Sequence, residues 1–175
     1  DKNGFLHASD IMPVYGRLEN GKSGDKKDVQ HLLRKGQEVV VQITKDSIGT
    51  KVPTLTTYIS LPGRYLVLMP SINKCGVSKK IADDEERQKL RIMLQRLNPP
   101  PGMGYIIRTA GADRSQGDLA RDLEYLLKLW GAILKRVRKE QSPVTLYEES
   151  DLVIRTIRDI FEPDITRIQV DEKTG

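Results

Sequence analysis

One apolar stripe constrains the fold of this chain more than any other sequence feature. It begins after Ser115, runs to about residue 140 and repeats every three or four residues, the spacing that gathers side chains on one face of an α-helix. Ser115 can cap this helix, and a basic segment at 135–139 suits its carboxyl end. The pattern predicts a long helix packed on the core, through Leu119, Leu123, Leu126, Leu127, Trp130, Ile133, Leu134 and Val137.

Shorter runs before this helix predict further elements of the same layer structure. Residues 65–69 (YLVLM) and 103–109 (MGYIIRT) are typical of strands, and 75–81 favours a short one. The stretch 83–97 favours an amphipathic helix with an acidic first turn, and the prolines at 99–101 end it. Its apolar face consists of Leu90, Met93, Leu94 and Leu97.

The first part of the chain carries mostly strand signals. Alternation within 37–46 and 53–61 predicts two strands joined by a turn, with one face formed by Val39, Val41 and Ile43 and the other strand's face by Leu55, Thr57 and Ile59. Phe5 and Leu6 read as the end of an earlier strand, residues 15–28 as a loop, and 28–37 as a short helix that ends at Gly36.

The order of elements predicts an α+β fold with a boundary near residues 62–64. The β-rich part has too few strands to close, and we interpret it as part of a small antiparallel barrel. The remainder is mixed α/β. After the long helix, 143–149 and 164–170 favour strands and 150–161 favours a second amphipathic helix.

Charge and cysteine content limit the cellular environments and the binding partners that this chain can have. The chain has 29 basic and 24 acidic residues and a formal charge of +5, which permits a polyanionic partner without demanding one. Its single cysteine, Cys75, excludes an intrachain disulfide and a cysteine-rich zinc site, and fits a reducing compartment. No stretch approaches the ~18 apolar residues of a membrane span. We expect a soluble, cytoplasmic protein without a membrane span.

Residues that would carry catalysis are scarce. His7 and His31 are widely separated, and no serine or cysteine stands in a recognisable nucleophile setting. The acidic run at 83–86 is better explained as a helix start than as a metal cluster. The sequence therefore predicts no catalytic residue and no metal site in this chain.

Binding residues are better supported, above all where Arg108 and Thr109 end an apolar strand just before a glycine turn. An arginine offers a rigid fork of donors for phosphate oxygens, and a threonine hydroxyl and backbone N–H groups can complete a small anion pocket. The helix that begins after Ser115 would add a favourable field. The alternative is a strand that simply reaches the surface and turns at Gly111.

A second group lies in the β-rich part. Lys45 and Lys51 flank a turn, where lysines supply sequence-independent affinity for a phosphate backbone, and an exposed Phe5 could stack on a base. The alternatives are a solvated turn for the two lysines and core packing for Phe5.

Five separated motifs of the chain are LTTYISLPGRYLVLMP, GVSKKI, GMGYIIRTAG, DLARDLEYLLKLW and LVIRTIRDIF. Together, in their order and approximate spacing, they resemble the ribonuclease E/G family of endoribonucleases. The resemblance implies three regions. Residues 1–60 resemble the later part of an S1-type oligonucleotide-binding (OB) domain, 61–152 a sensor of the RNA 5′ monophosphate, and 153–175 the start of a second RNase H-like segment.

The resemblance also implies roles for particular residues. The 5′ phosphate would be held by Arg108 and Thr109, by the strand that carries Gly63 and Val67, and by Lys79, where the family commonly has an arginine. The RNA-binding surface of the S1-type domain would use Phe5, Lys45 and Lys51.

For the whole enzyme, the resemblance implies a hydrolase of single-stranded RNA in RNA processing and decay, with magnesium, zinc and a homo-oligomeric assembly. The family's metal-binding aspartates and zinc-binding cysteines belong to later domains, so we expect no cofactor in this chain and no cleavage by it alone. Two alternatives stay open: a stand-alone RNA-binding module without nuclease activity, and an α/β protein whose motifs are packing features.

Overall fold

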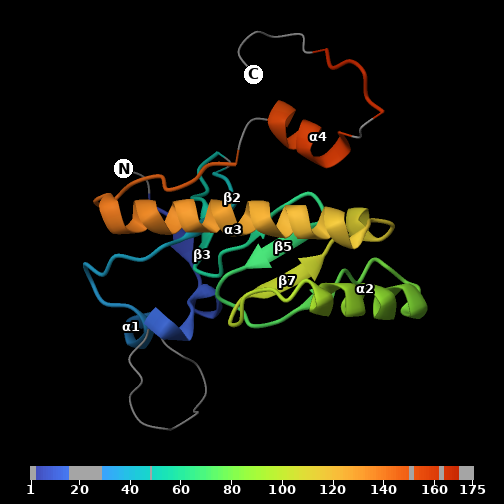
Figure 1. Ribbon diagram of the computed structural model, residues 1–175. Helices are drawn as coiled ribbons and strands as arrows, with labels where there is room; N and C mark the ends of the chain where they lie inside the picture. Colours follow the sequence, from blue (N-terminus) through green and yellow to red (C-terminus); the bar gives the residue numbers. More distant parts are fainter. Residues whose placement is uncertain (1–2, 16–28, 48, 150–151, 162–163, 170–175) are drawn as a thin grey trace, which may run out of the picture.

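The computed structural model describes residues 3–15, 29–47, 49–149, 152–161 and 164–169, and they form two separate sheets (Figure 1). The first sheet has the strand order β1-β3-β2, with bounds Phe5–Leu6, Thr54–Thr56 and Gln42–Lys45. The second has the order β4-β5-β7-β6, with bounds Leu61–Pro62, Leu66–Met69, Gly104–Ile107 and Gly76–Val77. The predicted α+β class is therefore confirmed, and the described strands form no closed barrel.

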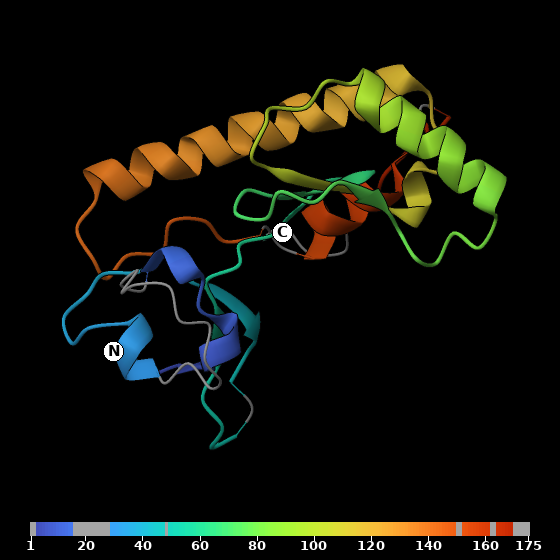
Figure 2. The same cartoon turned by 90° about the horizontal axis from the view of Figure 1, so that it is seen from below.

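The long predicted helix is α3, Gln116–Lys139, and it packs on the second sheet together with α2, Asp84–Arg96. Both helices lie on the same face of this sheet (Figure 2). Leu119 and Leu126 are fully buried there, against Leu66, Leu68 and Tyr105 of the strands. Trp130 is half-buried against the same core, as predicted.

Both helices begin where the sequence predicted, α3 after Ser115 and α2 with an acidic first turn. The Ser115 hydroxyl accepts the Asp118 N–H while the Asp118 carboxylate accepts the Ser115 N–H, which forms a capping box. Asp83 caps α2 by accepting the Glu85 N–H at 2.9 Å. The acidic run at 83–86 is thus the first turn of a helix.

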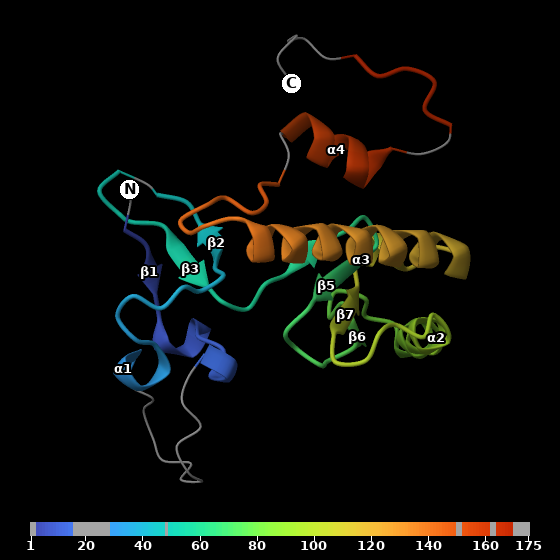
Figure 3. The same ribbon diagram turned by 60° about the vertical axis from the view of Figure 1, so that its left-hand side comes forward.

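The first sheet lies at the other end of the molecule from α2 (Figure 3). Strand β1 runs parallel to β3, and β2 runs antiparallel to it with an irregularity between Ile43 and Lys45. The strand predicted at 37–46 is shorter in the structure, because β2 begins only at Gln42; of the predicted face of Val39, Val41 and Ile43, only Ile43 lies in it, and Ile43 is 60% exposed. Gln42 instead points inward, where its amide exchanges two hydrogen bonds with the backbone of Ser60.

Several boundaries also differ from the prediction. Helix α1, Val29–Leu32, ends before Gly36, whose φ of +81° places it in the following turn. Residues 143–149 and 164–169 form no strand and pair with neither sheet in the described structure. The predicted loop at 15–28 lies almost wholly outside the described residues.

Helix α4, Leu152–Ile160, confirms the second amphipathic helix after the long one. It is drawn above α3 in Figures 1 and 3. Its Arg158 donates a hydrogen bond to the carbonyl of Pro62, at the end of β4. None of the helices in the described part of the chain is long and apolar enough to cross a membrane.

Candidate anion-binding site

The second sheet brings four chain segments to one edge. Strands β6 and β7 are parallel, so both end there, while β5 is antiparallel to β7 and begins there. Strand β4 ends at the same edge because Pro62 pairs with Val67. Gly63, Arg108, Thr109 and Lys79 therefore come from segments that meet at this edge, although the sequence separates them by up to 46 positions.

Arg108 is held at this edge through one nitrogen of its guanidinium. Its Nη1 donates to the carbonyl of Gly63, to the carbonyl of Arg64 at 3.2 Å, and to Asp159 Oδ1 at 3.2 Å. Across the described residues, the Nε and Nη2 of Arg108 donate no hydrogen bond. The side chain is 31% exposed, so this fork of donors is accessible to a ligand.

The carbonyls that hold Arg108 belong to a turn organised by Asp122 of α3. The Asp122 carboxylate accepts the N–H groups of Arg64 at 3.0 Å and of Tyr65 and Leu66 at 2.8 Å each. Gly63 is required beside it, because a Cβ at this position would lie 2.6 Å from Asp122 Oδ2. The sequence prediction missed Asp122, although an acid three residues after Leu119 in the apolar stripe was a usable signal.

Thr109 follows Arg108 at the start of a 3₁₀ turn, Thr109–Gly111, and is exposed. This turn is fixed to β5, because the Arg108 N–H donates to the Tyr65 carbonyl at 2.7 Å. The Tyr65 ring is buried beneath two further cations: the guanidinium carbons of Arg64 and Arg114 lie 5.0 and 5.4 Å from its centroid. Both guanidinium groups therefore make cation–π contacts with this ring.

The other two predicted phosphate residues are less directly connected. Lys79 is exposed on the loop after β6, and its neighbour Ser78 donates an N–H to Ile107. Arg87 of α2, a residue the prediction missed, holds this loop through the carbonyls of Ser78 and Ile81.

Val67 is half-buried and alternates with core residues of β5, so it lies on the sheet face opposite α2 and α3. The described contacts thus join Arg108 to Gly63 but join neither Lys79 nor Val67 to Arg108.

Helix α4 supplies an anion that the prediction also missed. Asp159 binds Arg108 and is itself held by Arg158, whose Nε lies 3.1 Å from Asp159 Oδ1. Burial raises the pKa of Asp159, but hydrogen bonds from Arg158 and Arg108 outweigh it, so the pKa lies below its ordinary value. Asp159 is therefore ionised at neutral pH, and Arg108 already holds one carboxylate.

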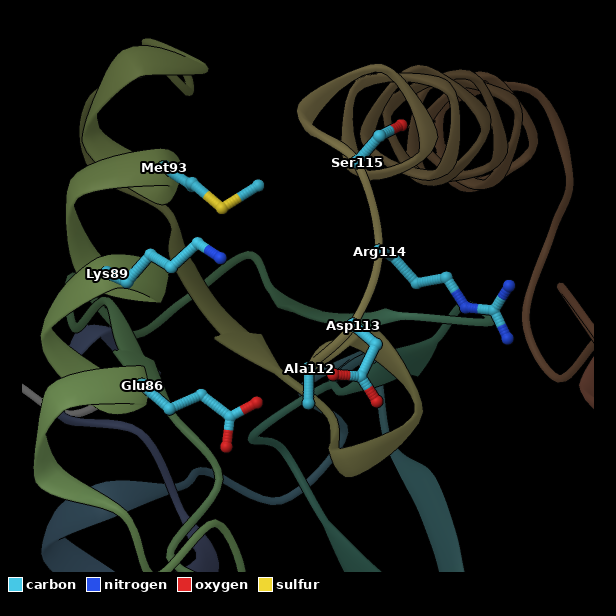
Figure 4. Close-up of a pocket in the computed structure, with 7 residues that line it drawn as sticks. All are labelled: Glu86, Lys89, Met93, Ala112, Asp113, Arg114 and Ser115. Atoms are coloured by element: carbon cyan, nitrogen blue, oxygen red, sulfur yellow. The ribbon is translucent and has the colours of Figure 1, made fainter.

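A pocket of about 430 Å³ opens next to this edge, between α2 and residues 112–115 (Figure 4). Its lining mixes both signs of charge, with Glu86 and Lys89 extending from α2 and Asp113 on the facing segment. Arg114 points away from α2 in this view. None of the predicted site residues lines this pocket.

The predicted RNA-binding residues of the first sheet form a second surface. Phe5 and Lys45 both pair with Thr54 and so share one row across the sheet. In-register neighbours on adjacent strands point to the same face. Phe5 is 53% exposed, which contradicts the alternative of core packing, and Lys45 and Lys51 are exposed on either side of the turn at Gly49.

The described residues contain no group of three or more histidine, cysteine or acidic side chains that could hold a metal ion. Cys75 is exposed and unpaired. We therefore assign no metal and no step through a metal to the described part of this chain.

These features define an α+β protein that presents an anchored guanidinium at one edge of its second sheet and a row of Phe5 and Lys45 on its first sheet. Residues 60–175 match the family described as Ribonuclease E/G family. The chain belongs to this family, as the five motifs predicted.

Curated relatives agree over nearly the whole chain. It is 41% identical to ribonuclease G of Escherichia coli strain K12, over 99% of this chain and 36% of that protein. It is 41% identical to ribonuclease E of Buchnera aphidicola, over 98% of this chain and 18% of that protein. It is 38% identical to ribonuclease E of Synechocystis, over 100% of this chain and 25% of that protein. The chain thus spans 18–36% of the length of these relatives.

Among solved structures, the RNase P protein of Staphylococcus aureus matches 41% of this chain and 80% of its own, with a TM-score of 0.32 and 18% identity. A likeness this low assigns no fold.

Proposed function

We propose that this chain is the RNA-binding and 5′-monophosphate-sensing part of a ribonuclease E/G-type endoribonuclease that cleaves single-stranded RNA in RNA processing and decay. Membership of the family supports the ribonuclease context. The observation that carries the sensing role is the state of Arg108: one nitrogen is anchored by backbone carbonyls while the Nε–Nη2 fork is accessible.

The chemistry of this fork matches a terminal phosphate. Two parallel N–H donors on a planar guanidinium fit two phosphate oxygens, and charge-assisted bonds are stronger than neutral ones. The exposed hydroxyl of Thr109 is the next donor along the chain. Lys79 would add positive charge, and the strand that carries Gly63 and Val67 would form the wall of the site. A monophosphate is small enough to be surrounded here, whereas a bulkier triphosphate would fit poorly.

The first sheet would bind a part of the RNA that is distant from the 5′ end. In this proposal residues 1–60 are the later part of an S1/OB-type domain, whose exposed Phe5 stacks on a base while Lys45 and Lys51 contact phosphates. Residues 61–152 form the sensor, and 153–175 begin an RNase H-like segment. Magnesium, zinc, a homo-oligomeric assembly and a cytoplasmic location are proposed for the whole enzyme.

The test compares two RNAs that differ only at the 5′ end. A short 3′-fluorescein-labelled oligouridine, with a 5′ monophosphate or a 5′ hydroxyl, is titrated with the chain and with Arg108→Ala, and binding is followed by fluorescence anisotropy. Charge-assisted hydrogen bonds contribute about 1.5–3 kcal/mol each, so the variant should bind the monophosphorylated RNA ~10-fold or more weakly. Its affinity for the hydroxyl-ended RNA should hardly change.

The matched control is Arg91→Ala, which removes the same charge from an exposed position on α2. It should leave the preference for the monophosphate intact. Equal weakening of both RNAs by Arg108→Ala would identify Arg108 as a general backbone contact or a structural residue, and the sensing proposal would then fail.

A further inference from the structure

We propose that Asp159 of α4 is a positioning residue for the 5′-phosphate site, so that the site is completed by the segment after the sensor region. This inference rests on the proposed function. Its basis is a set of hydrogen bonds that joins α4 to the turn after β4. These bonds pass through Arg108, the side chain that the proposed function requires.

The contacts run from Pro62 through α4 and Arg108 back to Gly63. Arg158 Nη1 donates to the Pro62 carbonyl at 3.2 Å, and Arg158 Nε donates to Asp159 Oδ1 at 3.1 Å. Asp159 Oδ1 accepts from Arg108 Nη1 at 3.2 Å, and Arg108 Nη1 in turn donates to the Gly63 carbonyl. The set therefore begins and ends on two consecutive residues of the turn.

Arg158 is itself anchored, which makes Asp159 a fixed acceptor. Its Nη1 lies 2.7 Å from Glu149 Oε1, and its side chain is 19% exposed. Asp159 thus cannot follow Arg108 freely, because its own carboxylate is held by a mostly buried, paired guanidinium.

The choice of nitrogen distinguishes a positioning role from competition with the ligand. A carboxylate that imitated phosphate would take the Nε–Nη2 fork, where two parallel donors are offered. Asp159 instead binds Nη1, the nitrogen already occupied by two backbone carbonyls. Asp159 thus gives Nη1 a third acceptor, which is charged. It leaves the Nε–Nη2 fork without a protein acceptor among the described residues, so the two donors that a phosphate needs stay available.

The experiment measures the ratio of the two dissociation constants, for hydroxyl-ended over monophosphorylated 3′-fluorescein-labelled oligouridine, with the full chain. A ratio cancels any change in general attraction to RNA. Asp159→Asn removes the charge and keeps the shape, Asp159→Glu keeps the charge, and Glu124→Gln is the charge-matched control on the exposed side of α3. Thermal unfolding followed by circular dichroism reports whether each variant is folded.

We expect Asp159→Asn to lower the ratio about three- to fivefold, the effect that a partly exposed ion pair supports. Asp159→Glu should restore at least part of it, and Glu124→Gln should leave it unchanged. Combined with Arg108→Ala, Asp159→Asn should cause no further loss, because both changes act on the same side chain.

The opposite results are equally clear. A ratio that rises in folded Asp159→Asn means that the carboxylate competes with the phosphate, and an unchanged ratio means that Asp159 has no part in the site; either overturns the inference and leaves the proposed function standing. An unmodified chain that does not discriminate between the two RNAs overturns the proposed function and this inference with it.

Discussion

Asp122→Asn probes the turn that the whole candidate site depends on. Asp122 is 9% exposed, and its two carboxylate oxygens accept three backbone N–H groups, from residues 64 to 66. Asparagine keeps the size and shape of the side chain. It removes the charge and replaces one acceptor oxygen by an NH₂ donor.

The magnitude follows from counting the bonds in the better of the two amide orientations. With the amide oxygen in place of Oδ2, the N–H groups of Tyr65 and Leu66 keep an acceptor, now a neutral one, and the Arg64 N–H faces a donor. Bonds to charged groups contribute about 1.5–3 kcal/mol against 0.5–1.5 for neutral ones, and an unpaired buried donor costs about 1–3. Together these changes should lower the free energy of unfolding by about 3–6 kcal/mol.

The assay is urea unfolding followed by far-ultraviolet circular dichroism, with Glu124→Gln as the control on the same helix. Glu124 is exposed and pairs with Lys128 one turn later, so its change should stay within about 0.5 kcal/mol. A loss below about 1 kcal/mol for Asp122→Asn would refute the reasoning, because it would show that water or a rearranged turn satisfies the three N–H groups.

Two further variants test the start of α3 and the first sheet. Ser115→Ala removes the capping hydroxyl and should cost about 1 kcal/mol in the same unfolding assay; a cost near zero would contradict the capping box. The hydrogen bond from Ser115 is the main cause that lowers the pKa of Asp118. The stability from this contact is therefore present above the ordinary carboxyl pKa and is lost as pH falls through the pKa of Asp118, and Ser115→Ala should reduce that acid-side loss. Lys45→Gln should weaken the binding of both oligouridines alike. It should also make the negative slope of log affinity against log salt less steep by roughly 0.7. An unchanged slope would exclude Lys45 as a phosphate contact.

The regular elements of the second sheet and its helices could be predicted from sequence because their signals are local and repeated. The predicted apolar stripe after Ser115 lies along one face of α3, and the structure buries this face from Leu119 to Ile133, whereas Val137 in the last turns is exposed. The acidic first turn of α2 and the apolar run of β7 are equally self-contained. Such patterns predict an element without knowledge of what packs against it.

Segments whose structure depends on distant partners were predicted less well. Residues 143–149 have strand-forming side chains but pair with neither sheet in the described structure. In the first sheet, the strand predicted at 37–46 is only Gln42–Lys45, and Ile43, the one residue of the predicted apolar face that lies in it, is exposed. Propensity is local, whereas register is set by the neighbouring strand.

For the candidate site, Arg108, Thr109 and Lys79 were predicted from sequence, whereas Arg87, Asp122 and Asp159 were missed. Arg108 stands out because it ends an apolar strand, but nothing local in the sequence connects it to Asp122 or Asp159, which act from 14 and 51 positions away in the chain. A count of formal charge treats these carboxylates as opposing the basic residues. Their contacts show the reverse: each fixes part of the frame in which one guanidinium is held.

The same frame explains why Gly63 belongs with Asp122. The glycine has no side chain to offer a ligand, and its φ does not lie in the left-handed region. It is needed because the carboxylate approaches so closely that any Cβ would displace it, and displacing it would release three N–H groups and the carbonyls that anchor Arg108. The glycine of the turn, the acid of α3 and the arginine of β7's end therefore form one structural unit, and substitution of any one of them should alter the geometry presented by the other two.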